Sequence, residues 1–230
     1  HLSLRRQRQM CIRDRKLWQY LMNRELVKRI ISSIIILPLA FYFLLAGPFF
    51  SIFFIFICFI VSCYEWNKMN KSNFNKILGF IFLLFAFYTF YHLSFDLFLL
   101  VFAILICIST DIGGYIFGKI FKGPKITKIS PNKTYAGMIG GYLLSLICLS
   151  IFTNYMYYQG IYFQFLLLTV LLSTVSQAGD IIVSYFKRKA GIKNTSSLIP
   201  GHGGLLDRID GMIFAVPTLY IIDITGLLNT

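Results

Sequence analysis

The sequence contains 230 residues, of which 57% are hydrophobic and 13% are charged, so it is more apolar and less charged than a soluble globular domain. Its formal net charge of +13 would indicate a nucleic-acid partner in a soluble protein, but several apolar runs approach the roughly 20 residues that span a bilayer. We therefore predict an all-α, polytopic integral membrane helical bundle, attribute the positive charge to cytoplasmic loops, and expect no nucleic-acid binding.

The first 21 residues differ from the rest of the chain. They hold six of the 22 Lys and Arg residues and no membrane-spanning run, and Met22 then opens a stretch typical of the start of a membrane protein. We therefore divide the chain into residues 1–21, a non-native or disordered basic arm, and residues 22–230, a single membrane catalytic domain. A native arm that binds anionic lipid is the alternative.

Seven apolar runs predict about seven transmembrane helices. Their approximate limits are Ile30–Ala46, Phe49–Tyr64, Ile77–His92, Phe95–Thr110, Met138–Tyr155, Ile161–Ala178 and Gly211–Leu228. With these spans, every Lys and Arg falls on one side of the membrane, and the positive-inside rule makes that side, with the N-terminus, cytoplasmic. The two long connections, after the fourth and sixth spans, also face this side, so we expect the chemistry there.

The first long connection carries polar groups that suit a phosphate ligand. It begins with Asp111, and a segment rich in lysine and hydroxyl residues follows. The candidate phosphate-binding residues in that segment are Lys125, Ser130, Lys133 and Thr134. Gly137 and Gly141, four residues apart at the start of the fifth span, favour close helix packing rather than catalysis.

The sixth span leads into a second polar segment. On a continuous helix, one face would present Asp180, Ser184, Lys187 and Arg188. A metal-bound polyphosphate needs this mixture, because the acid can hold the metal while the bases hold the phosphates. We also expect Lys187 and Arg188 to anchor the helix at the cytoplasmic interface.

A glycine-rich turn, Pro200–Gly204, precedes two acids near the seventh span. Its backbone N–H groups could form an anion-binding nest, or the turn could be an ordinary flexible loop. If the next residues are helical, Asp207 and Asp210 share a face and converge on one point, as a Mg²⁺ site requires. From spacing alone, ion pairs with Arg208 and nearby lysines are an equally good interpretation. His202 could contact phosphate, move a proton or cap the turn.

These segments resemble the phosphatidate cytidylyltransferase (CDP-diacylglycerol synthase) family. Residues 184–210, SYFKRKAGIKNTSSLIPGHGGLLDRID, are similar to its signature at Ser184, Lys187, Arg188, Lys193, His202, Gly203, Gly204, Asp207, Arg208 and Asp210. Residues 111–141 resemble an earlier conserved stretch, and Glu65-Trp66 a weaker feature. The sequence departs from the family at Asn194, which is usually Asp, at Ala136, commonly Glu, and at Gly114, commonly Ala.

The resemblance implies that the chain transfers a cytidylyl group from CTP to phosphatidic acid, with Mg²⁺ and optionally a second cation. It assigns metal binding to Asp180, Asp207 and Asp210. It assigns phosphate neutralisation to Lys187, Arg188, Lys193 and Arg208. It assigns the nucleotide loop and the facing wall to His202, Gly203, Gly204, Ser184, Asp111, Lys125, Ser130, Lys133 and Thr134. A homodimer in a bacterial-type inner membrane, with its active site facing the cytoplasm, is also implied.

Other functions remain open at this point. A related nucleotidyltransferase or lipid kinase would keep the site and change the substrate. A transporter would place polar groups near the bilayer midplane, often on broken helices. An inactive membrane scaffold is prompted by the carboxylates missing at Asn194 and Ala136.

Overall fold

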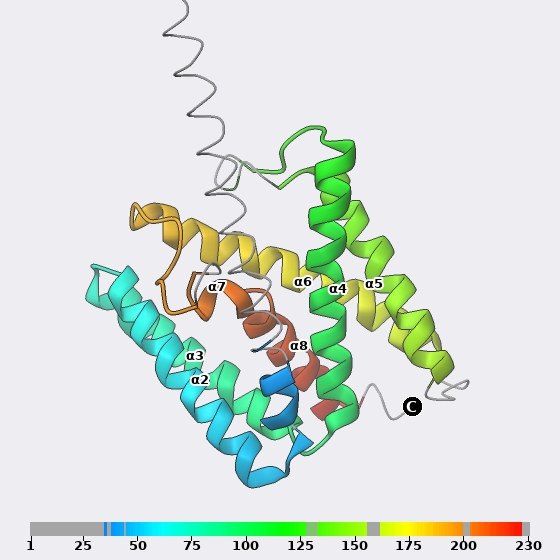
Figure 1. The fold of residues 1–230 in the computed structure, drawn as a ribbon, viewed down its shortest axis with the longest axis horizontal. Coiled ribbons are helices and arrows are strands. Elements are labelled where there is room, and N and C mark those ends of the chain that lie inside the picture. The colour runs from blue at the N-terminus through cyan, green and yellow to red at the C-terminus, as the bar shows by residue number, and fades with distance from the viewer. Residues whose placement is uncertain are drawn as a thin grey trace, which may run out of the picture.

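The structure is a computed structural model that describes residues 35, 38–43, 45–127, 130, 133–155, 162–199 and 203–226. This part of the chain is helical, and its only β-type pairings are two isolated bridges. The helices are α2 (Pro48–Met69), α3 (Asn73–Leu93), α4 (Leu97–Phe121), α5 (Tyr135–Tyr155), α6 (Tyr162–Lys189), α7 (Leu206–Ile209) and α8 (Met212–Ile224) (Figure 1). The all-α architecture predicted from hydropathy is confirmed.

Helices α2 to α6 are each long and apolar enough to cross a membrane, and α8 is a shorter apolar helix. They coincide with six of the seven predicted spans. The first predicted span, Ile30–Ala46, lies mostly outside the described residues, as does the arm of residues 1–21. The chain is therefore a multi-pass membrane bundle, while the count of seven spans and the cytoplasmic N-terminus stay predictions.

Two helices extend beyond the apolar spans predicted for them. The fourth and sixth spans were expected to stop at Thr110 and Ala178, but α4 and α6 continue for roughly three more turns. Hydropathy marks where apolar residues stop, whereas a helix continues until its backbone is interrupted. The interruption of α6 comes at Gly191, whose φ of 74° is left-handed and whose N–H bonds to the Arg188 carbonyl oxygen. Much of each polar segment therefore lies on rigid helix rather than in a loop.

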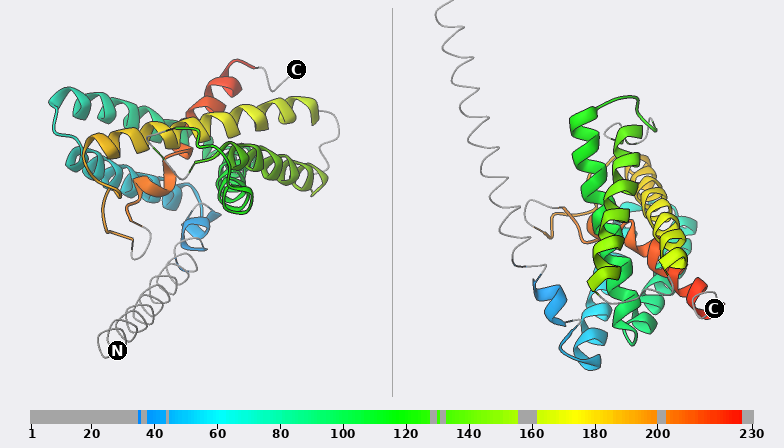
Figure 2. Two further views of the ribbon diagram at one scale, coloured as in Figure 1. Left: turned by 90° about the horizontal axis from the view of Figure 1, so that it is seen from above. Right: turned by 90° about the vertical axis from the view of Figure 1, so that its right-hand side faces the viewer.

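Helices α4 and α5 pack against each other, as the right-hand view of Figure 2 shows. Glycines allow this close contact. A Cβ at Gly113 would overlap the Gly140 carbonyl oxygen, and one at Gly137 would lie 2.7 Å from the Gly114 carbonyl oxygen. The packing role predicted for Gly137 is confirmed, and it fixes the start of α5 against α4.

Helix α8 packs against α3, α4 and α6, so it joins the α2–α3 pair to the α4–α5 pair. A cluster of buried residues that includes Leu83, Val183, Leu206 and Ile213 packs α3, α6, α7 and α8 together. In Figure 1 the α2–α3 turn, the α4–α5 connection and the C-terminal end of α6 lie towards the upper side, and the α3–α4 turn lies at the lower end. The polar segments thus gather at one end of the bundle.

Candidate active site

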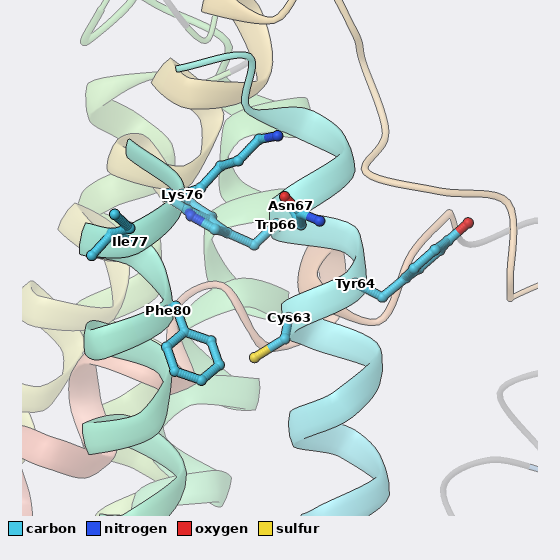
Figure 3. Close-up of a pocket in the computed structure, with 7 residues that line it drawn as sticks. All are labelled: Cys63, Tyr64, Trp66, Asn67, Lys76, Ile77 and Phe80. Atoms are coloured by element: carbon cyan, nitrogen blue, oxygen red, sulfur yellow. The ribbon is translucent and has the colours of Figure 1, made fainter. Parts of the chain in front are cut away.

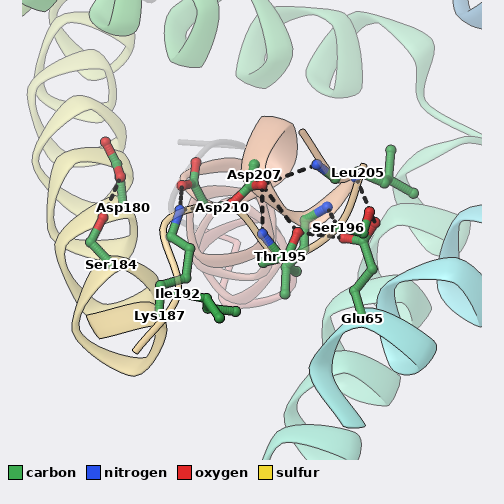
Figure 4. A network of polar contacts seen from close by, with 12 residues as sticks. Glu65, Asp180, Ser184, Lys187, Ile192, Thr195, Ser196, Leu205, Asp207 and Asp210 are labelled. Carbon is green, nitrogen blue, oxygen red and sulfur yellow. Dashed lines mark hydrogen bonds and ion pairs between the residues drawn. The ribbon is translucent and has the colours of Figure 1, made fainter. Parts of the chain in front are cut away.

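A buried lysine on α6 links two acids, one in the short helix α7 and one at its C-terminal end (Figure 4). The Lys187 Nζ atom lies 2.9 Å from Asp207 Oδ1 and 3.6 Å from Asp210 Oδ2. The two carboxylates therefore converge on one point, as their one-turn spacing predicted. The group at that point is the Lys187 ammonium. Of the two interpretations left open by the sequence, the geometry is therefore that of ion pairs, with Lys187 as the base.

Asp207 holds the loop that precedes it. Its Oδ2 atom accepts hydrogen bonds from the N–H groups of Thr195 and Gly204, at 2.8 and 3.0 Å, and lies 3.1 Å from the Thr195 hydroxyl oxygen. Burial alone would raise the pKa of Asp207, but the bonds from Gly204, Lys187 and Thr195 outweigh it and hold the pKa below its usual value. Asp207 is therefore an ionised carboxylate with both oxygens engaged.

Asp210 has the opposite electrostatic character. Asp210 is only 8% exposed. Its burial and the nearby Asp180 carboxylate raise its pKa well above the usual range, despite the attraction of Lys187. Functional sites commonly contain neighbouring acids whose pKa values are shifted in opposite directions, so that one is ionised and the other favours its neutral form. A cation at this point would stabilise the ionised form of Asp210.

Asp180 connects the two long polar segments. Its Oδ1 atom accepts a hydrogen bond from the Ser184 hydroxyl at 3.2 Å, and its Oδ2 atom lies 2.5 Å from the Nζ of Lys133. Lys133, in the α4–α5 connection, also lies 3.4 Å from the Gln177 carbonyl oxygen. The facing wall expected from residues 111–134 therefore reaches α6 through Lys133, and Asp111 on α4 is close enough to interact with Asp180 electrostatically.

The other residues of the α4–α5 connection serve its own shape. Lys125 and Thr134 form an isolated antiparallel bridge, and the Thr134 hydroxyl accepts the Gly137 N–H at 3.1 Å, which caps α5. Ser130 donates its N–H to the Thr127 hydroxyl. Phosphate contacts by Lys125, Ser130 and Thr134 stay predictions.

The remaining bases of the signature are exposed at the surface of the same end. They are Arg188, Lys193 and Arg208. The Arg188 guanidinium donates to the Ile192 carbonyl oxygen at 3.1 Å, beyond the end of α6. Lys187 and Arg188, adjacent in sequence, thus differ: one is buried among acids and the other faces the solvent side.

The glycine-rich turn can be followed only in part, because Pro200, Gly201 and His202 lie outside the described residues. Gly203 has φ of 87°, pairs with Ile199 and donates its N–H to the Ile199 carbonyl oxygen. The Gly204 N–H goes to Asp207. Both N–H groups have acceptors within the protein, so the turn shapes the loop here, and an anion-binding role for it stays a prediction.

Glu65 was missed as a component of this site. It is fully buried in the last turns of α2, and its carboxylate accepts hydrogen bonds from the hydroxyls of Thr195 and Ser196, at 2.8 and 2.6 Å. The N–H groups of Leu205 and Leu206 donate to it as well, at 3.0 and 2.8 Å. A helix far away in the sequence therefore fixes the loop between α6 and α7.

A separate pocket of about 420 Å³ lies between α2 and α3, next to this site (Figure 3). Its lining is mainly apolar, with Trp66, Ile77 and Phe80, and Lys76 stands at its edge. The Trp66 indole N–H donates to the Asn75 carbonyl oxygen at 2.9 Å and fastens α2 to α3. None of the signature acids lines this pocket, so the candidate site is the acid cluster on α6 and α7.

Comparison with known proteins gives the family. The sequence matches the model of the Cytidylyltransferase family over residues 77–224. It is 40% identical over 124 residues to the phosphatidate cytidylyltransferase of Staphylococcus saprophyticus, a match that covers 54% of this chain and 48% of that protein. It is 37% identical over 130 residues to the phosphatidate cytidylyltransferase of Bacillus subtilis, over 56% of this chain and 48% of that protein.

The chain spans about half the length of the curated relatives it matches. The matched region runs from the second turn of α3 to the end of α8 and includes Asp111, Asp180, Asp207 and Asp210. Since the family model covers more than half of the sequence, this chain belongs to the cytidylyltransferase family.

Proposed function

We propose that the chain transfers the cytidylyl group of CTP to phosphatidic acid, giving CDP-diacylglycerol and pyrophosphate. The observation that carries the proposal is the convergence of Asp180, Lys187, Asp207 and Asp210 at one end of a membrane bundle, inside the region that matches the family. The names of the relatives supply the substrates. A site at the end of the helices would let a water-soluble nucleotide meet a lipid headgroup at the bilayer surface.

In this reaction a phosphate oxygen of phosphatidic acid attacks the α-phosphorus of CTP. A new P–O bond forms there, the bond from the α-phosphorus to the bridging oxygen breaks, and pyrophosphate leaves with that electron pair. The nucleophile is already an anion, so no strong base is needed. The protein's contribution is to position the two anions and to neutralise charge that moves to the leaving group.

The formal charge of the cluster supports a requirement for a cation. Four acids and three bases interact there, so the cluster carries one negative charge when Asp210 is ionised and no net charge when Asp210 is protonated; they are Asp111, Asp180, Asp207, Asp210, Lys133, Lys187 and Arg208. Neither charge state attracts a nucleoside triphosphate, whereas one divalent cation would make the site positive. We therefore propose Mg²⁺ as cofactor, where it would supply charge neutralisation for the phosphates. A second cation remains part of the proposal.

The carboxylates that fit this ion best are Asp180 and Asp210. Asp210 is buried beside Asp180, and a shared cation would remove the repulsion that raises its pKa. Asp207 fits less well, because its Oδ2 accepts two backbone N–H groups and its Oδ1 accepts Lys187. We propose that Asp207 orients the loop and Lys187, while Lys133 and the exposed Arg188, Lys193 and Arg208 contact phosphates.

We further propose that this end of the bundle faces the cytoplasm in a bacterial-type inner membrane, and that the protein acts as a homodimer. The cytoplasmic placement follows from the distribution of Lys and Arg. The homodimer follows from the family resemblance. Protease accessibility of the α4–α5 connection in oriented vesicles would test the first, and mass measurement of the purified protein in detergent would test the second.

The function is tested with CTP labelled at either end of its triphosphate. Purified protein is incubated with phosphatidic acid, Mg²⁺ and CTP carrying ³²P at the α or the γ position, and the chloroform-soluble lipid is counted. The proposal requires α-label in lipid and γ-label in pyrophosphate. Transfer of γ-label to lipid would indicate a kinase instead.

Two variants accompany the wild-type protein in this assay. Asp210→Asn should abolish most of the transfer, because it removes a proposed metal ligand. Ser62→Ala, a change at a buried α2 residue outside the acid cluster, should transfer label like wild type. Folded wild-type protein that transfers neither label, while a verified relative does, would refute the enzyme function and leave transport as the next hypothesis.

A further inference from the structure

We propose that Glu65 is a positioning residue for this site: its carboxylate fixes the loop between α6 and α7, and thereby the direction in which Asp207 and Asp210 point. The inference rests on the proposed cytidylyltransferase function, since it gives Glu65 a part in that reaction. Glu65 is fully buried, so it acts through the loop rather than on a substrate.

Glu65 caps α7 from another helix. The first N–H groups of a helix lack partners within the helix, and α7 has only four residues and no side-chain cap of its own. The Glu65 carboxylate accepts the N–H groups of Leu205 and Leu206, where α7 begins. So short a helix has little stability alone, and therefore its orientation depends on contacts of this kind.

Thr195 connects Glu65 to Asp207. The Thr195 hydroxyl oxygen lies 2.8 Å from Glu65 Oε2 and 3.1 Å from Asp207 Oδ2, and the Thr195 N–H donates to the same Asp207 oxygen at 2.8 Å (Figure 4). A hydroxyl has one proton, so it can donate to only one of the two acids at a time. A displacement of Glu65 therefore shifts a residue that Asp207 contacts twice.

The contacts of Glu65 and Asp207 with this loop leave no room for a side chain at Gly203 or Gly204. A Cβ at Gly204 would overlap the Thr195 hydroxyl oxygen and lie 2.5 Å from Glu65 Oε2. A Cβ at Gly203 would lie 2.8 Å from Asp207 Oδ2. Both glycines of the signature thus make space for the Glu65 and Asp207 carboxylates, so the loop and the two acids fit together as one unit.

Simple stabilisation of the fold is the competing explanation, and it accounts less well for the pattern of bonds. A buried carboxylate is costly unless its hydrogen bonds are satisfied, and an apolar residue often fills such a space at lower cost. The four hydrogen bonds described for the Glu65 side chain all end on residues 195–206. A residue kept only to join α2 to the bundle would not need every bond to reach that loop.

The test compares variants of Glu65 that differ in acceptor number and length. Glu65→Gln keeps the shape but replaces one acceptor oxygen with a donor that opposes the N–H groups of the loop. Glu65→Asp keeps the charge on a shorter side chain. Ser62→Ala is the control, because Ser62 is also fully buried on α2 and its hydroxyl has no hydrogen-bond partner among the described residues.

Initial rates are measured in detergent with CTP, phosphatidic acid and Mg²⁺, well below the unfolding temperature of each variant. We expect Glu65→Gln to lower kcat about 10- to 100-fold while KM changes less, because displaced catalytic groups cost rate more than binding. The kcat of Glu65→Asp should lie between that of Glu65→Gln and that of wild type, and Ser62→Ala should match wild type. A folded Glu65→Gln protein with wild-type kcat would overturn the inference.

Thr195→Val covers the case in which Glu65→Gln does not fold. It removes the shared hydroxyl and leaves Glu65 in place. We expect it to lower kcat, and to lower it by a smaller factor when Glu65→Asp is already present, because two residues in one network are not additive. Wild-type kcat in both Glu65→Asp and Thr195→Val would also overturn the inference.

Hydrogen exchange separates this inference from the proposed reaction. Without substrates, Glu65→Gln (or Glu65→Asp, should Glu65→Gln not fold) should speed exchange at the N–H groups of Leu205 and Leu206, and the Ser62→Ala protein should not. If wild type proves inactive but this change appears, the loop is positioned by Glu65 and the proposed reaction is refuted. If exchange at these two residues is unchanged, the inference fails whatever the activity.

Discussion

Replacing Lys187 with Met would test the electrostatic design of the site most directly. Met has a similar length and no charge, so the change removes the ammonium while it retains most of the packing. The Lys187 and Asp207 side chains are 9% and 6% exposed, and Nζ lies 2.9 Å from Asp207 and 3.6 Å from Asp210. Two buried carboxylates would lose their closest described cation.

The magnitude follows from these distances. With an effective dielectric constant of about 20, the attraction is about 6 kcal/mol at 2.9 Å and about 5 kcal/mol at 3.6 Å, before desolvation is subtracted. Removing one partner of a buried ion pair typically costs about 3–5 kcal/mol. Because the raised pKa of Asp210 lets it take up a proton and escape part of the penalty, we expect a loss of about 3 kcal/mol.

The assay is equilibrium unfolding of purified protein in mixed micelles near neutral pH without added metal, with Lys189→Met as the matched control. Lys189 ends the same helix but is exposed, so its loss should change the free energy of unfolding by less than about 0.5 kcal/mol. If Lys187→Met unfolds with the same free energy as Lys189→Met, Lys187 is not the counter-ion of Asp207 and Asp210. In an Asp207→Asn background the penalty should shrink, because one of the two charges is already gone.

Two further predictions use thermal unfolding. In EDTA, Asp210→Asn should raise the unfolding temperature relative to wild type, and the increase should be larger at pH 8 than at pH 5. The pKa of Asp210 is raised in the folded protein, so its contribution to stability is complete only below the unfolded pKa of about 3.9 and is lost as pH rises through the folded pKa. Asn cannot ionise, so the variant escapes this loss. A difference independent of pH would contradict this. Gly113→Ala should destabilise by about 1–3 kcal/mol, since its Cβ would overlap Gly140, whereas Gly114→Ala, whose Cβ would lie 3.7 Å from the Gly137 carbonyl oxygen, should stabilise by about 0.5–1 kcal/mol. Equal effects of the two alanines would refute the packing described for α4 and α5.

The membrane bundle was predictable because long apolar runs have few alternatives. In hydrocarbon every backbone polar group must be satisfied within the chain, which leaves the helix as the solution for such a run. The ends of α4 and α6 were not predictable from hydropathy. Polar residues such as Asp180 and Ser184 can continue a helix when their side chains form hydrogen bonds within the protein, as these two do with each other. The boundary of the membrane and the boundary of the helix are therefore separate properties.

The convergence of Asp207 and Asp210 was predictable from their spacing, but their partner was not. The sequence offers several bases near these acids, and local periodicity placed Lys187 and Arg188 together on one face. In the structure Lys187 is buried between the acids, while Arg188 is exposed and donates to Ile192. Adjacent residues on a helix point about 100° apart, so only the position of α7 relative to α6 decides which of the two meets the carboxylates.

Glu65 shows what kind of local signal could have revealed a distant contact. It lies in the C-terminal part of α2, where the helix dipole disfavours a negative charge, and it follows an apolar run where an acid is costly. The closest base in the sequence, Lys68, has the i+3 spacing of a helical ion pair, but in the structure its Nζ lies over the Tyr64 ring while Glu65 is fully buried. An acid in a locally unfavourable position must gain its stability elsewhere. Its partners, residues 195–206, are about 130 positions away, so the sequence can indicate that a partner exists but only the fold identifies it.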